Sequence, residues 1–153
     1  MRPEEIRPDT ALSTILGYNA QTGESRRYFN KWLKMNGINA TAIALNITDE
    51  HFDFTMSSVG ESKVDKMILE YEFKVKALEY CQEIDGDSVD FIEVIDKRVI
   101  GYNLESKVSE LFDNRLEFID DRAKFIAKMM IIANRWYGVK IDIEQIPLLL
   151  IEN

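Results

Sequence analysis

The chain has 153 residues, of which 46% are apolar, so it can bury one sizeable core and we expect a single domain over residues 1–153. Its formal charge of −8 disfavours non-specific binding to nucleic acid or to an anionic membrane, because both partners attract a basic surface. With one cysteine, Cys81, and no apolar run of signal-peptide or membrane-spanning length, the sequence predicts a cytoplasmic protein.

The first third of the chain predicts a strand followed by a helix. Residues 1–10, with two prolines and several charges, are expected to form a flexible lead-in, and the apolar stretch 12–16 predicts a buried strand. Ser25 stands where an N-cap would precede a helix over 26–36. Gly37 supplies the end of that helix.

The next segments continue the alternation of strands and helices. Residues 41–47 are apolar and β-branched and predict a strand, and Thr48 is expected to cap a helix of about ten residues. Apolar and charged side chains alternate over 67–74, which predicts a half-buried strand with one charged face. A short helix is expected over 75–82.

The last third predicts a hairpin and a long helix. Residues 88–94 and 98–103 read as two strands joined by a turn at 96–97, and apolar spacing predicts a helix over 117–138 that packs on the domain. The apolar tail 141–151 either docks on the domain or meets a partner chain, and we favour docking. Strands that alternate with helices indicate an α/β fold, a three-layer sandwich with a mostly parallel, mixed sheet of about six strands.

The order and spacing of separate segments resemble the shikimate dehydrogenase family. Residues 17–42 can be laid without a gap on the family's Gly-x-Pro-x-x-His-Ser-x-Ser-Pro-x-x-His-Asn segment and the helix that follows it. Residues 68–74 fall on its Asn-x-Thr-x-Pro-x-Lys signature, and 88–91 fall on its Ala-Val-Asn-Thr strand. Gly-Tyr-Asn-Leu-Glu at 101–105 is similar to the family's Gly-Tyr-Asn-Thr-Asp, and Trp-Tyr-Gly at 136–138 is similar to the end of its last helix.

The resemblance implies the N-terminal substrate-binding domain of that family together with the returning C-terminal helix. In the family a complete NADP-binding domain lies between the segments that match 101–105 and 117–138, and too few residues separate them here to hold one. A Rossmann site needs a glycine-rich turn between strand and helix, and the seven glycines form no such cluster. We therefore expect no cofactor, and NADP in particular is not expected to bind this chain alone.

The resemblance also implies a degraded catalytic dyad. In the family a lysine and an aspartate flank the reacting hydroxyl and manage its proton while hydride passes to NADP, and Lys74 and Glu105 are the matching residues. Glutamate keeps the carboxylate but adds a methylene, which shifts the position of its hydrogen bonds. The alternative is that both residues are ordinary surface charges.

The expected substrate-binding residues have changed in chemistry. The resemblance implies that they are Ser25, Glu70, Asp90, Asn103 and Lys128. Acids outnumber lysines at the cleft positions, which would repel an anionic ligand, so we expect shikimate to bind weakly or not at all. Alternatively the acids form salt bridges with Lys74 and Lys128 that close a disused cleft.

Three functions remain open at this point. The first is a non-catalytic homologue that binds a small polar ligand in an altered cleft. The second is a structural or self-association module, such as a homodimer, with a filled cleft, and the third is a dehydrogenase completed by a cofactor domain from another polypeptide. His51, the only histidine, has no Cys or His neighbours at metal-ligand spacing, so no metal site is expected.

Overall fold

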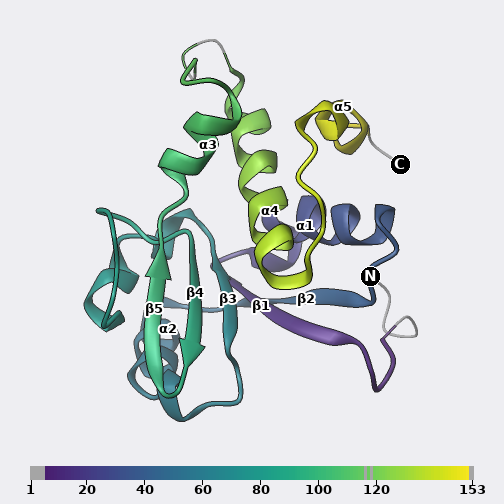
Figure 1. The fold of residues 1–153 in the computed structure, drawn as a ribbon. Coiled ribbons are helices and arrows are strands. Elements are labelled where there is room, and N and C mark those ends of the chain that lie inside the picture. The colour runs from purple at the N-terminus through teal and green to yellow at the C-terminus, as the bar shows by residue number, and fades with distance from the viewer. Residues whose placement is uncertain (1–5, 116, 118, 152–153) are drawn as a thin grey trace.

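The computed structural model describes residues 6–115, 117 and 119–151 (Figure 1). Within them, one mixed sheet has the strand order β2-β1-β3-β4-β5. The strands are β1 (Ala11–Gly17), β2 (Ala40–Asn46), β3 (Lys66–Leu69), β4 (Phe91–Ile95) and β5 (Arg98–Tyr102). Strand β1 lies parallel to both β2 and β3, whereas β3, β4 and β5 pair antiparallel.

Helices cover both faces of this sheet. They are α1 (Glu24–Met35), α2 (Asp49–Ser57), α3 (Glu105–Leu111), α4 (Asp121–Tyr137) and α5 (Ile146–Leu149). One apolar core contains residues of α1, α4 and α5 against β1 and β2, and a second core contains residues of α2 against β3 and β4. The predicted three-layer α/β sandwich is confirmed, with five strands in the described residues where about six were expected.

Strand β3 is shorter and more deeply buried than the alternating pattern predicted. Met67, Ile68 and Leu69 are each at most 1% exposed, because the two cores cover the two faces of this central strand. The chain then leaves the sheet in two short 3₁₀ helices, Tyr71–Phe73 and Lys76–Tyr80. The prediction of a half-buried strand over 67–74 with a charged face is therefore wrong, and the helix expected over 75–82 is a 3₁₀ turn.

The start of α1 differs from its prediction in a way that affects the site. Gly23 is the N-cap, and Ser25 lies inside the first turn of the helix, where it is 1% exposed. Its hydroxyl donates to Glu70 rather than accepting from the amides of its own helix. At the other end, the helix ends at Met35 and Gly37 has a φ of 66°, the left-handed conformation expected of a stop residue.

Two local predictions about turns and caps are confirmed. The Thr48 hydroxyl accepts from the backbone N–H of His51 at 3.3 Å and caps α2. Asp96 and Lys97, the two turn residues between β4 and β5, have φ angles of 51° and 66°. Two successive positive φ values are typical of the type I′ turn, whose twist matches that of the strands it joins.

The last helix begins later than predicted. Asp120 accepts from the N–H of Arg122 at 2.8 Å and caps α4, so the helix starts at Asp121 and not at 117. Residues 116 and 118 lie outside the described residues, as do 1–5 of the predicted lead-in. Thr10, also expected in that lead-in, is 8% exposed, and its hydroxyl donates to the side chain of Asn39 at 2.8 Å.

The apolar tail docks on the domain, as predicted. Leu149 of α5 is fully buried in the core that includes α1 and α4. The ammonium of Lys31 on α1 donates to the carbonyls of Leu149 and Ile151, at 3.3 and 2.6 Å. These bonds satisfy carbonyls that the end of a helix leaves without an intrahelical partner.

Candidate functional site

A cavity of about 700 Å³ lies between the start of α1, the segment after β3, α3 and the first half of α4. Its lining residues are Glu24, Glu70, Tyr71, Lys74, Ser88, Asp90, Asn103, Glu105, Val108, Asp121, Lys124, Phe125 and Lys128. Every predicted site residue is among them except Ser25, which lies behind Glu70. The structure thus brings together residues as far apart in the sequence as Glu24 and Lys128.

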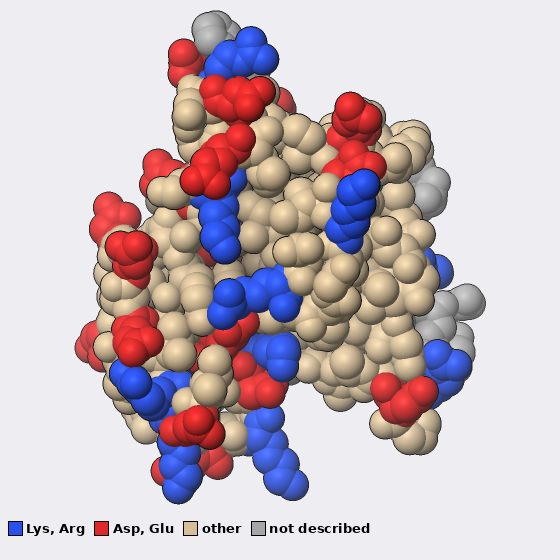
Figure 2. Space-filling model, in the orientation of Figure 1, with Lys and Arg blue, Asp and Glu red and all other residues tan. Residues whose placement is uncertain are grey.

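Acidic side chains outnumber lysines by five to three in this lining. On the face of the molecule shown in Figure 2, acidic and basic side chains are interspersed rather than separated into patches of one sign. Inside the cavity, Asp90 is bonded to two of the lysines and Asp121 to the third. The remaining acids leave a negative balance, as the sequence predicted.

The lining of the cavity includes a buried carboxylate that holds two ammonium groups. Asp90, directly before β4, is 3% exposed, and its Oδ1 accepts from Lys74 Nζ at 2.6 Å and from Lys128 Nζ at 3.0 Å. Its Oδ2 accepts from the backbone N–H of Leu104 at 2.7 Å. Burial alone would raise the pKa of Asp90, but the two lysines and this N–H outweigh it and hold that pKa below its usual value.

Lys74 and Glu105, the two residues of the predicted dyad, are not bonded to each other in the described residues. Both Lys74 and Glu105 line the cavity, but the Lys74 ammonium is bonded to Asp90, and no hydrogen bond or ion pair joins it to Glu105 in the part of the chain described. Glu105 is exposed at the first position of α3. Burial lowers the pKa of Lys74, and the nearby Asp90 carboxylate opposes that shift by favouring the charged ammonium.

A second carboxylate of the cavity lies against the start of α1. Glu70 Oε2 accepts from the Ser25 hydroxyl at 2.8 Å. Burial raises the pKa of Glu70, and the bond from Ser25 opposes that change. Asn103, also in the lining, has a positioning role: its amide donates to the carbonyl and the hydroxyl of Ser88, both at 3.0 Å, and its Oδ1 accepts from the N–H of Glu105.

Sequence reasoning missed the other buried carboxylate, Glu93 on β4. It is 8% exposed and accepts from Arg135 Nε at 2.7 Å, Arg135 Nη2 at 3.0 Å, Trp136 Nε1 at 2.8 Å and the Tyr102 hydroxyl at 3.0 Å. The Arg135 guanidinium also lies 4.3 Å from the centre of the Tyr102 ring. This cluster joins the end of α4 to the sheet and lies outside the cavity lining, so we assign it to stability.

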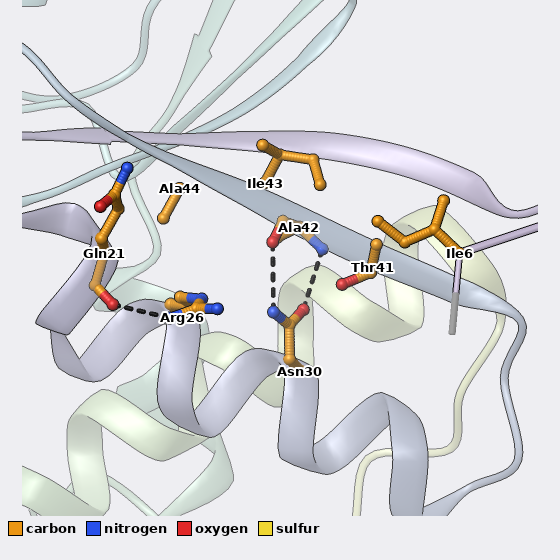
Figure 3. A pocket seen from close by; sticks show the side chains of 8 residues that line it. All are labelled: Ile6, Gln21, Arg26, Asn30, Thr41, Ala42, Ile43 and Ala44. Atoms are coloured by element: carbon orange, nitrogen blue, oxygen red, sulfur yellow. Dashed lines mark hydrogen bonds between the residues drawn. The ribbon is translucent and has the colours of Figure 1, made fainter. Parts of the chain in front are cut away.

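A smaller pocket of about 180 Å³ lies beside the edge strand β2 (Figure 3). Its main polar feature is Asn30 of α1, whose amide donates to the Ala42 carbonyl at 3.1 Å and whose Oδ1 accepts from the Ala42 N–H at 2.8 Å. Asn30 thus satisfies both backbone groups that Ala42 turns away from β1. Because the polar groups of the Asn30 side chain already bond the backbone of β2, this pocket is a weaker candidate than the large cavity.

The described residues contain neither a candidate metal centre nor a membrane-spanning helix. No group of three or more His, Cys, Asp or Glu side chains there could hold a metal ion. No helix in the same part of the chain is long and apolar enough to cross a membrane.

Comparison with known proteins gives a result only at the level of structure. No protein-family model and no curated protein matches the sequence. A solved structure of shikimate dehydrogenase from Aquifex aeolicus superposes with a TM-score of 0.59 at 18% identity, covering 77% of this chain and 45% of the other. The chain has a shikimate dehydrogenase-like fold.

Two further solved structures extend this likeness. The Thermus thermophilus shikimate dehydrogenase, solved with NADP(H) and shikimate, matches with a TM-score of 0.58 at 15% identity, over 85% of this chain and 54% of that one. The 5-ketofructose reductase of Gluconobacter sp. strain CHM43 matches with a TM-score of 0.58 at 12% identity, over 80% and 51%. The chain therefore spans about half the length of these enzymes, and at these identities the likeness concerns the fold.

Proposed function

We propose that this chain binds a small polar molecule in the cavity beside Asp90 and does not itself transfer hydride. The observation that carries the proposal is that Lys74 and Lys128 both donate to the Asp90 carboxylate, in the lining of a cavity of about 700 Å³. In a shikimate dehydrogenase-like site, the lysine would share the reacting hydroxyl with the carboxylate at position 105. Here a buried carboxylate engages that lysine at 2.6 Å and favours its charged form against the effect of burial, so the carboxylate bonded to the lysine is Asp90 and not Glu105.

The cavity itself favours ligand binding over the alternative of a filled cleft. The salt bridges on Asp90 lie in the cavity lining, and a space of about 700 Å³ remains beside them. A site with apolar surface and a few convergent polar groups is the usual form of a small-molecule site. We further propose that NADP does not bind this chain alone, because its glycines form no turn that could approach a pyrophosphate.

Shikimate is expected to bind this chain weakly. The cavity has a negative balance, and the buried Asp90 already engages the cations that would attract the ligand's carboxylate. Titration followed by NMR is expected to give a dissociation constant above about 1 mM for shikimate, and no saturable change with NADP. Micromolar binding of either compound would contradict the proposal.

A screen of small polar metabolites by thermal shift and NMR tests the positive half of the proposal. We expect neutral or cationic compounds to perturb the signals of cavity residues, and we expect Glu105→Lys to lower the affinity of the cationic ones by about fivefold or more through charge repulsion at the rim. Glu110→Lys is the matched control, because Glu110 is exposed on the same helix α3 and outside the cavity lining. Equal effects of the two substitutions, or ligands that perturb only other surfaces, would refute the cavity as the binding site.

A further inference from the structure

The side chain of Glu70 occupies a position that is built for a carboxylate. The Ser25 hydroxyl, buried in the first turn of α1, donates to it at 2.8 Å. Glu70 belongs to a different segment, directly after β3, and its own backbone N–H donates to Leu16 at 2.9 Å. A carboxylate from elsewhere in the chain is therefore held at the start of this helix.

Two glycines make room for that carboxylate. A Cβ on Gly17 would lie 2.5 Å from Glu70 Cγ, and a Cβ on Gly23 would overlap Glu70 Oε1. Gly23 is also the N-cap of α1 and has no side chain with which to cap the first amides of the helix. The Glu70 carboxylate thus lies at the N-terminus of a helix of 12 residues, where the helix dipole and the free N–H groups favour an anion.

We propose that Glu70 is the residue that determines the charge selectivity of the cavity: its carboxylate occupies an anion subsite beside Ser25 and so excludes ligands that carry a carboxylate at that end. This inference rests on the proposed small-molecule function. It specifies the class of ligand: a molecule with no anionic group at the end that faces α1. A ligand carboxylate would have to displace Glu70 from Ser25 and approach Glu24 and Glu72 as well, both of which raise the pKa of Glu70 by their charge. Exclusion therefore has a steric and an electrostatic part.

The test compares a variant that removes both parts with one that removes only the charge, with benzoate as an anionic probe and benzamide as its neutral isostere. Glu70→Ala empties the subsite and leaves Ser25 available, so benzoate affinity measured by NMR titration is expected to rise about tenfold or more, and benzamide affinity by less than about threefold. Glu70→Gln removes the charge but keeps the subsite filled. We expect it to raise the affinity for either probe by less than about threefold. Glu70→Thr, which suits the extended backbone at this position, serves as a second emptying variant if the alanine protein is unfolded.

Two further proteins complete the design. Adding Ser25→Ala to Glu70→Ala is expected to abolish the gain in benzoate affinity, because the hydroxyl is the donor that the probe would use. Glu72→Ala removes a nearby charge outside the cavity lining but leaves Glu70 in the subsite, so benzoate affinity is expected to stay unchanged within about threefold. An equal gain in Glu70→Gln and Glu70→Ala, or no gain in a folded emptying variant, overturns the inference.

These outcomes separate the inference from the function on which it rests. If neutral or cationic compounds bind the unmodified cavity but the emptied variants gain nothing for benzoate, the selectivity role is wrong and the binding function stands. If the emptied variants gain benzoate binding but no compound binds the unmodified protein, Glu70 occupies an anion subsite in a cavity that has lost its ligand.

Discussion

Asp90→Ala is expected to lower the free energy of unfolding by about 3 to 5 kcal/mol, the usual cost of removing one partner from a buried ion pair. The substitution leaves the ammonium groups of Lys74 and Lys128, whose side chains are only 17% and 26% exposed, without their shared carboxylate. It also leaves the backbone N–H of Leu104 without an acceptor. Since domains of this size are stable by about 5 to 15 kcal/mol, urea denaturation at neutral pH should show a much lower midpoint.

Matched variants assign this loss to the buried bridge. Asp65→Ala removes a carboxylate that is 55% exposed and paired with Lys66 at 3.3 Å, and it should cost less than about 1 kcal/mol. In the Asp90→Ala background, Lys74→Met should recover part of the lost stability, because it removes one of the stranded charges. A cost below about 1 kcal/mol for Asp90→Ala would mean that both lysines reach solvent without the carboxylate.

The order of elements was predictable because each depends on local chemistry. The cap at Thr48, the turn at 96–97 and the apolar periodicity of α4 act over a few residues, and the structure reproduces them. Strand β3 shows where local patterns fail. Its alternating sequence is typical of a strand with one solvent face, but two cores meet on this central strand and the chain leaves the sheet after Leu69.

The site was predictable in membership and only in part in pairing: salt bridges from Lys74 and Lys128 to the acids were one of the two alternatives, and both lysines bond Asp90. The resemblance to a family placed Lys74, Asp90, Glu105 and Lys128 at one cleft, and all four line one cavity. Which carboxylate Lys74 bonds depends on distances of a few ångströms between segments that are far apart in the sequence, and no spacing rule supplies them. The same reason explains why Ser25 was expected to cap a helix, whereas its hydroxyl donates to Glu70 across the fold.

Glu93→Gln is expected to lower the free energy of unfolding at pH 7 by about 2 to 4 kcal/mol, because hydrogen bonds to a buried charge contribute more than neutral ones. The carboxylate accepts from Arg135, Trp136 and Tyr102. A glutamine in its place would put an NH2 group, which can only donate, where one accepting oxygen now meets these donors. Burial would raise the pKa of Glu93, but these bonds outweigh burial and hold the pKa below the ordinary value of 4.5. The folded protein therefore favours the charged form.

The sign of the pH dependence follows from that shift. A carboxylate with a lowered folded pKa contributes stability that is fully present above its unfolded pKa of 4.5 and is lost as the pH falls through the lower folded value. The stability difference between the wild type and Glu93→Gln should thus be largest near neutral pH and should shrink below about pH 4.5. Glu83→Gln, which weakens an exposed pair with Arg98, should change stability by less than about 1 kcal/mol. Denaturation curves of wild type and Glu93→Gln that differ by the same amount from pH 7 to pH 3 would show that Glu93 does not carry the charge on which this cluster depends.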